Sequence, residues 1–359
     1  MTHSPATLPL SILDLVPVPE GSSSSQAILN SISLAQAADR AGYTRYWIAE
    51  HHNMKSVVSA APEILLGVVA TQTSRIRVGS GGIMLPNHAP LKVAENFRTL
   101  EALAPGRIDL GIGRAPGTDG VTALALRGSQ EALHRDDLPD QLAEMLAYTG
   151  AEGYFPAGHP LGQVRATPQD VPLPPIFLLG SSTYSAQLAA QLGYGFAFAY
   201  HFSSAQAEQA MTLYRQNFRP SAQLEKPHAI LATVAVAADT ESQAQRLSSS
   251  IGLMFLNIRK GLREFIPSPE TALAYPYTPQ ERGFVESYAA THSVGTPAQV
   301  RASLEALAAR YGADELMITA ALHDPAARNH SYELIAAEFG LGQPTQGPVE
   351  QQREAVLAG

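Results

Sequence analysis

The residues best suited to acid–base chemistry lie together at the end of an apolar segment. Residues 45–54 read RYWIAEHHNM, so Glu50, His51 and His52 follow an aromatic-rich run. A neutral imidazole beside a carboxylate is suited to proton transfer near neutral pH. Neighbouring residues of a strand point to opposite faces, so the two histidines are poorly placed to bind one metal ion. The same alternation does not tell which histidine would face a site.

Glycine, hydroxyl and guanidinium groups follow other apolar runs. The segment 79–82, GSGG, is either a turn or a place where the backbone closely approaches a flat ligand. The segment 180–185, GSSTYS, is either an ordinary helix cap or an anion site of backbone N–H groups and hydroxyls. Arg114 could supply the cation for that anion or form a salt bridge at a rim. It ends GIGR, which lacks the third glycine of a dinucleotide fingerprint.

These residues are set in a regular alternation of short apolar strands and longer segments of helical periodicity. Eight strands separated by helices are typical of parallel βαβ units and favour a (β/α)8 TIM barrel. A doubly wound open sheet is the alternative. The predicted strands are 10–15, 46–51, 75–81, 107–113, 174–182, 195–202, 228–238 and 314–322, and the predicted helices include 26–42, 62–74, 91–106, 183–193, 204–218 and 326–339.

Polar residues end most of the predicted strands. Barrel active sites lie at the carboxyl ends of the strands, so these residues should meet at one mouth. They would form a polar, glycine-rich ring on an apolar body. The ring consists of Asp14, Glu50, His51, His52, Ser80, Gly81, Gly82, Gly111 to Arg114, Gly180 to Thr183, Tyr200 and His201.

Two insertions, after the fourth and seventh strands, interrupt the alternation. Residues 115–173 include a predicted helix near 131–149, and residues 255–292 contain four prolines and little periodicity. A loop that follows a barrel strand lies over the active-site mouth, and long loops are often functional. We therefore interpret 255–292 as a lid. The expected organisation is one domain, 1–345, followed by a C-terminal tail, 346–359.

The composition argues against several classes of partner. Of the 359 residues, 45% are apolar and 16% are charged, which suits a sizeable core and argues against extensive disorder. A net charge of −8 without a basic stripe argues against nucleic acid as a partner. The chain has neither a secretion signal nor an apolar run of about 18 residues, so we expect a cytoplasmic protein without a membrane span. The absence of cysteine excludes disulfides and thiolate chemistry.

Four long stretches carry a resemblance to a known family. They are WIAEHHN (47–53), RIRVGSGGIMLPNHAPLKVAENFRTLEALAPGRIDLGIGRAPGTDG (75–120), LLGSSTYSAQLAAQLG (178–193) and SVGTPAQVRASLEALAARYGADELMI (293–318). In this order they resemble the bacterial luciferase-like flavin monooxygenases over most of the chain. The resemblance implies the same (β/α)8 barrel that the alternation of elements predicts.

The resemblance also implies a reaction and its partners. Members bind reduced flavin mononucleotide (FMNH2), react with O2 to give a flavin C4a-peroxide and oxidise a small organic substrate. A separate NAD(P)H:flavin reductase would supply FMNH2, and a homodimer would form through helices 62–74 and 91–104. The segment PEILLGVVA is apolar nearly all round, which suits a helix covered on both sides. The alternatives are a deazaflavin (F420)-dependent oxidoreductase and a flavin-binding protein without turnover.

Roles for individual residues follow from the same resemblance. His51 corresponds to the acid/base histidine of the family and Glu50 precedes it, so both are candidate catalytic residues. His52 and Glu50 are expected to tie down the strand end by hydrogen bonds. Gly81 and Gly82 fall where the family often has a non-proline cis peptide against the flavin ring. The other candidate cofactor ligands are Asp14, Ser80, the phosphate-side Arg114, and the phosphate loop of Gly180, Ser181, Ser182, Thr183 and Tyr184.

One stretch departs from the family pattern. The run APGTDG after Arg114 differs from luciferase, so no substrate-pocket residue is carried over there. Asp119 is a candidate polar group in this run. The identity of the organic substrate and the emission of light are not implied.

Overall fold

Eight parallel strands form the centre of the computed structural model, which describes residues 8–134 and 137–342. Each strand hydrogen-bonds to its two neighbours in the ring, and the last strand pairs with both the first and the seventh, which closes the barrel. The predicted barrel is therefore confirmed, and the open sheet is excluded. In ring order the strands are β1 (Leu10–Asp14), β2 (Arg45–Ile48), β3 (Arg77–Ser80), β5 (Ile108–Gly113), β6 (Ile176–Gly180), β7 (Gly195–Ala199), β8 (Ala229–Ala237) and β10 (Glu315–Thr319).

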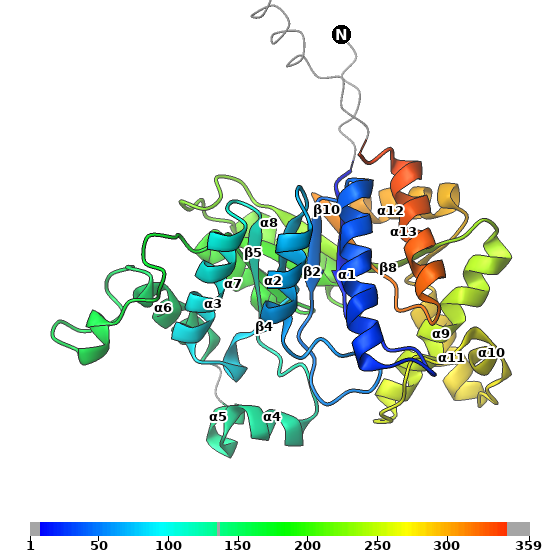
Figure 1. The fold of residues 1–359 in the computed structure, drawn as a ribbon, viewed down its shortest axis with the longest axis horizontal. Helices are drawn as coiled ribbons and strands as arrows, with labels where there is room; N and C mark the ends of the chain where they lie inside the picture. The colour runs from blue at the N-terminus through cyan, green and yellow to red at the C-terminus, as the bar shows by residue number, and fades with distance from the viewer. Residues whose placement is uncertain (1–7, 135–136, 343–359) are drawn as a thin grey trace, which may run out of the picture.

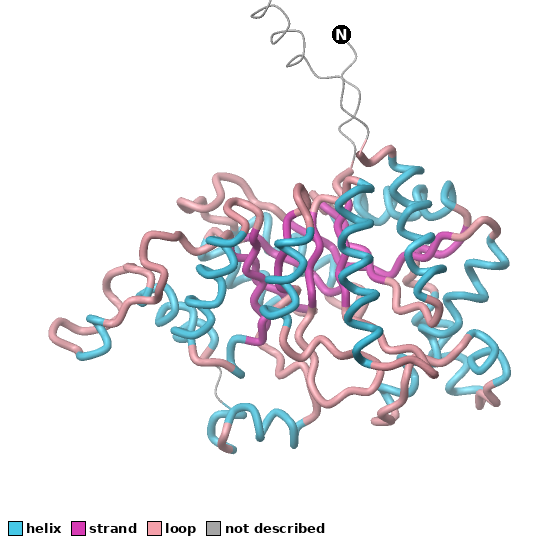
Figure 2. Tube along the Cα trace, viewed as in Figure 1, coloured by secondary structure: helices cyan, strands magenta, loops and turns pink. Residues whose placement is uncertain are grey.

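Helices surround the barrel, as Figures 1 and 2 show. Two short strands, β4 (Ile83–Met84) and β9 (Ser293–Gly295), pair with the ends of β5 and β8. The helices are α1 (Ser24–Ala41), α2 (Pro62–Gln72), α3 (Pro90–Leu103), α4 (Gly120–Arg127), α5 (Gln130–His134), α6 (Leu138–Tyr148), α7 (Thr183–Leu192), α8 (Ala207–Asn217), α9 (Glu241–Arg259), α10 (Pro269–Ala274), α11 (Pro279–Ala289), α12 (Pro297–Tyr311) and α13 (Pro325–Phe339), with 3-10 turns η1 (Leu85–Asn87) and η2 (Pro160–Gln163).

The strands bury apolar side chains on both faces. Alternate residues of each strand point into the barrel or outward against the helices. In β2, for example, Tyr46 and Ile48 belong to the outer core, whereas Trp47 belongs to an inner core with Phe177. This double burial is why the barrel strands read as continuous apolar runs in the sequence.

Buried ion pairs close the amino-terminal end of the barrel. Arg45 lies 2.7 Å from Asp109 and 3.0 Å from Glu315, and Arg77 lies 2.6 Å from the other oxygen of Asp109. His228 lies 3.0 Å from Glu315. In barrels of this type the amino-terminal face contributes to stability, which leaves the carboxyl ends of the strands for a site.

The inserted helices α4, α5, α10 and α11 lie on the carboxyl-terminal side of the barrel, toward the lower side of Figure 1, whereas α6 lies at its left edge. Residues 255–292 contain helices despite the weak periodicity of their sequence, because the first residues end α9 and the rest includes α10 and α11. These two helices are short and begin with proline after a capping residue, Ser268 or Thr278. Helix α11 buries none of its residues, so its sequence carries little apolar periodicity.

The predicted C-terminal tail and the predicted absence of a membrane span concern the chain as a whole. The predicted tail 346–359 and the predicted domain boundary at 345 lie outside the described residues. Within the described ranges, every helix is too short or too polar to cross a lipid bilayer.

Candidate active site at the carboxyl ends of the strands

His51 follows the inner face of β2. Trp47 and Ala49 both belong to the inner core of the barrel, whereas Ile48 packs in the outer core. The same alternation carries Glu50 outward and His51 inward, toward the mouth. The structure thereby distinguishes the two histidines, which strand alternation alone left equivalent, because His52 contacts Glu50 whereas His51 lies near His201.

The imidazole of His51 is held neutral. Burial lowers its pKa, and the nearby His201 lowers it further, to about 4, although Glu50 opposes the shift. Its Nδ1 atom is buried and has no hydrogen-bond partner among the described residues. A buried polar atom without a partner is costly, so a ligand atom at this place would be favoured.

Two more histidines lie near His51. His201 follows β7 and donates from Nδ1 to the carbonyl of Ala232 at 3.2 Å. His292 precedes β9, and its buried Nε2 has no partner in the described part of the chain. Burial lowers the pKa of both to about 4, and His201 also lowers that of His292. His201 is thus close to both His51 and His292, and we refer to the region around these three imidazoles as the histidine chamber. Among the described residues, no group of three or more His, Asp or Glu side chains is placed to hold a metal ion.

Glu50 occupies the other side of the strand end. Its buried carboxylate accepts from the backbone N–H of Met84 at 2.7 Å and from Asn87 at 3.2 Å, and lies 2.8 Å from His52 and 3.0 Å from His88. Burial raises its pKa, but these donors outweigh that effect and lower the pKa overall. Glu50 was expected as a second catalytic side chain, yet its oxygens are occupied in joining β2 to β4 and η1. His88 and Asn87 were not predicted.

Asp14 was expected to be a cofactor ligand, but its contacts are those of a structural residue. Its fully buried carboxylate lies on the outer side of the sheet, where it accepts from Arg328 at 2.6 Å, from the N–H of Val16 at 2.8 Å and from the hydroxyls of Ser31 and Tyr46. Burial raises its pKa, but Arg328, Ser31 and Tyr46 lower it overall. The expected role as a cofactor ligand does not fit this geometry, because the carboxylate joins β1 to α1 and α13 instead.

The glycine pair after β3 has the expected geometry. The peptide bond between Gly81 and Gly82 is cis. A Cβ atom on Gly81 would lie 2.5 Å from Cδ1 of Leu13, and one on Gly82 would lie 2.8 Å from the carbonyl of Gly111. Ser80 is fully buried and donates to the same carbonyl at 2.8 Å. Packing against the backbone of Gly111 therefore requires glycine at position 82, whereas a Cβ on Gly81 would require the Leu13 side chain to move. The Ser80 hydroxyl is used within the sheet.

The predicted phosphate loop and its arginine are brought together. Residues 180–182 end β6 and precede α7, and Ser182 caps that helix without using its side chain. The guanidinium of Arg114 lies 4.1 Å from the ring centroid of Tyr184, in the first turn of α7. Because a helix N-terminus and a cation both favour negative charge, these residues fit the phosphate group of a flavin nucleotide.

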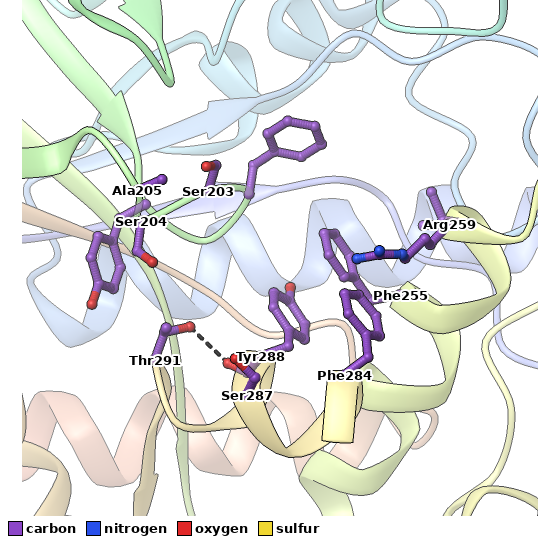
Figure 3. A pocket seen from close by; sticks show the side chains of 12 residues that line it. Ser203, Ser204, Ala205, Phe255, Arg259, Phe284, Ser287, Tyr288 and Thr291 are labelled. Carbon is purple, nitrogen blue, oxygen red and sulfur yellow. Dashed lines mark hydrogen bonds between the residues drawn. The ribbon is translucent and has the colours of Figure 1, made fainter. Parts of the chain in front are cut away.

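A cavity of about 680 Å³ lies beside the chamber, between the loop that follows β7 and the inserted helices (Figure 3). Ser203 and Ser204 line one side of it, and Phe255 and Tyr288 line another. The Tyr288 hydroxyl donates to the carbonyl of His201 at 3.1 Å. This volume is typical of small-molecule sites.

Comparisons of the sequence with a family model and with known proteins all point to monooxygenases. A family model described as luciferase-like monooxygenase matches residues 8–315. The "Luciferase-like monooxygenase" of Escherichia coli (strain K12) is 44% identical over 328 residues, which are 91% of this chain and 96% of that protein. The "N-acetyl-S-alkylcysteine monooxygenase" of Bacillus subtilis (strain 168) is 34% identical over 91% of this chain and 97% of that protein.

Solved structures share the fold. The crystal structure of apo-MsnO8 is 38% identical, with a TM-score of 0.84 over 93% of this chain and 99% of that one. The oxygenating constituent of 3,6-diketocamphane monooxygenase from Pseudomonas putida, solved with FMN, is 21% identical, with a TM-score of 0.67 over 93% and 98% of the two chains. The match along residues 8–315 and the identity to full-length relatives show that this chain belongs to the luciferase-like monooxygenase family.

Proposed function

We propose that this enzyme uses FMNH2 and O2 to oxidise a small organic substrate. The observation that carries the proposal is that a candidate anion site and the histidine chamber lie at the carboxyl ends of the same barrel. The anion site contains Arg114 and the amino-terminal end of α7. The chamber contains His51, whose buried Nδ1 has no partner among the described residues.

Different residues of the candidate site would bind the phosphate, contact the flavin ring and transfer a proton. Arg114 and the hydroxyls of Ser181, Ser182 and Thr183 would hold the phosphate of FMN, and the backbone of Gly81 and Gly82 would lie beside its ring. Reduced FMN, once bound, supplies the activation of O2. His51 would hold or move a proton at Nδ1. A negative charge placed beside this imidazole would raise its pKa from the low value that burial imposes, toward the range useful for proton transfer.

The supply of reduced cofactor is part of the proposal. A separate NAD(P)H:flavin reductase would provide FMNH2. The test is the spectrum of the purified protein, followed by titration with FMN and measurement of O2 uptake with chemically reduced FMN. Candidate substrates would begin with N-acetyl-S-alkylcysteines, because the Bacillus subtilis relative is named for them. Binding of a deazaflavin in preference to FMN, or FMN binding without substrate-dependent O2 uptake, would contradict the proposal.

Arg114→Ala should weaken FMN binding about tenfold or more while leaving riboflavin binding nearly unchanged. Charge-assisted hydrogen bonds contribute about 1.5 to 3 kcal/mol each, and only FMN carries the phosphate that Arg114 would meet. Flavin fluorescence titration measures both affinities. Arg165→Ala is the matched control, since this exposed arginine donates to carbonyls of its own loop. Equal losses for the two flavins in Arg114→Ala would show that this side chain does not meet the phosphate.

The inserted segment 255–292 would act as a lid that excludes water from the chamber. Arg263 lies 3.0 Å from Asp119, and the backbone of Ile266 hydrogen-bonds with that of Val18 and Glu20 at 2.9 Å, so these contacts dock the segment over the mouth. We expect limited proteolysis to cut there first, and FMN with substrate to slow the cutting. Resistance of this segment while other loops are cleaved would make it a structural insertion.

The enzyme would form a homodimer through α2 and α3. The side chains of Ile64 and Leu103 are 67% and 55% exposed on these helices, which leaves apolar surface for a partner. We expect the wild-type protein to sediment as a dimer at micromolar concentration and the Ile64→Glu variant to sediment as a monomer. Leu273→Glu, at a 63% exposed leucine on α10, should leave the dimer intact. A monomeric wild-type protein would rule out this assembly.

A further inference from the structure

Parallel aromatic rings form one wall of the 680 Å³ cavity. The ring of Phe255 is stacked 4.0 Å from that of Tyr288, at an interplanar angle of 7°, and 6.1 Å from that of Phe284, at 8°. These rings come from α9 and α11, so the two helices build the wall together. A flat or extended apolar group would gain both burial and ring contacts against such a surface.

A single cation, Arg259, shares this cavity with the rings (Figure 3). Its guanidinium lies 4.3 Å from the ring centroid of Phe284, which holds it by a cation–π contact. In Figure 3 it lies across the cavity from Ser203 and Ser204. The guanidinium is therefore oriented at one end of an otherwise mainly apolar and hydroxyl-lined space.

Arg259 differs from the neighbouring cations in its partners. Lys260 lies 2.7 Å from Glu281, and Arg263 lies 3.0 Å from Asp119, so each is neutralised by a carboxylate. Among the described residues no carboxylate forms an ion pair with Arg259. A planar guanidinium matches the geometry of a carboxylate and can bind it with two parallel hydrogen bonds.

Resting on the function proposed above, we propose that the substrate is an organic acid whose carboxylate binds Arg259 and whose apolar body lies against Phe255, Phe284 and Tyr288. Tyr288 lines the cavity and its hydroxyl donates to the backbone carbonyl of His201, so this side of the cavity adjoins a residue of the histidine chamber. A substrate held by its carboxylate at Arg259 would thus direct its opposite end toward the chamber. Arg259 would recognise the charge at one end of the substrate, and the aromatic rings would recognise its apolar body. Together they select organic acids.

The test uses 3-phenylpropionate and its neutral amide, 3-phenylpropionamide. Isothermal titration of the full-length protein loaded with oxidised FMN should show the acid binding about ten- to a hundred-fold more tightly than the amide, as expected for one charge-assisted contact. Arg259→Gln should abolish this preference without changing amide binding, and Arg259→Lys should retain part of it. Thermal unfolding of each variant shows that binding is compared between folded proteins.

The matched control is Arg282→Gln. Arg282 also lies over an aromatic ring, that of Tyr277 at 5.6 Å, but it does not line the cavity, so this variant should retain the full preference. Failure of wild-type protein to bind the acid, equal binding of acid and amide, or an unchanged preference in Arg259→Gln would overturn the inference. The same titrations without FMN, together with an FMN titration, separate the two proposals. FMN binding without acid preference refutes only the organic-acid inference, whereas acid preference without FMN binding refutes the proposed cofactor.

Discussion

Replacing His51 with alanine should lower coupled turnover of the FMNH2-supplied enzyme by at least two orders of magnitude and change FMN affinity no more than a few-fold. General acid/base groups typically contribute about 10² to 10⁴-fold to rate. His51 is suited to this role because its Nδ1 is buried and has no partner among the described residues, whereas the proposed phosphate ligands follow other strands. Substrate-dependent O2 uptake measures turnover, and fluorescence titration measures FMN affinity.

His52→Ala is the matched control for this prediction. His52 is the same residue type one position along, but its Nε2 lies 2.8 Å from the Glu50 carboxylate. Removing it takes one partner from a buried carboxylate, so we expect a loss of about 1 to 3 kcal/mol in unfolding free energy and little change in turnover. Near-normal turnover in His51→Ala together with inactivity in His52→Ala would show that the catalytic histidine had been assigned one residue too early.

The barrel could be predicted because its strands are buried on both faces and therefore appear as separate apolar runs. All eight ring strands were predicted within a few residues of their observed bounds. Two helices of the ring, α9 and α12, were not predicted. The first half of α9 is rich in polar residues, and its apolar end at Phe255 was assigned to the insertion instead. Local periodicity thus identified strands more reliably than helices with interrupted apolar faces.

The site was predicted less completely, because strand position does not determine which face a terminal residue occupies. Asp14 ends a strand, as a cofactor ligand would, but its partner Arg328 is 314 residues away in the sequence. His292 was also overlooked, since it belongs to an insertion and follows no barrel strand. Only tertiary packing brings it near His201. Motif resemblance proposed Arg114 and the loop before α7 as one site, and the structure brings Arg114 next to Tyr184 at the start of that helix.

Asp14→Ala should lower the free energy of unfolding by about 3 to 5 kcal/mol, the range typical when one member of a buried ion pair is removed. Asp14 and Arg328 are 0% and 4% exposed, so the guanidinium would stay buried and would still donate to the carbonyl of Ala320. The lowered pKa of Asp14 means that the pair is fully stabilising above the ordinary aspartate pKa of about 3.9. The stabilisation by this ion pair is lost as the pH falls through the lowered pKa that Asp14 has in the folded protein.

Urea unfolding at neutral pH, followed by circular dichroism, measures this loss. If Asp14→Ala is too unstable to purify, the double variant Asp14→Leu with Arg328→Met should be markedly more stable than either single variant, because it removes both charges. Glu305→Ala is the matched control, since it breaks an exposed helical pair with Arg301 and should change stability by no more than about 0.5 kcal/mol. A strong loss of FMN affinity in Asp14→Ala at unchanged stability would instead restore Asp14 as a cofactor ligand. The buried contacts with Arg328, Ser31 and Tyr46 favour the structural role.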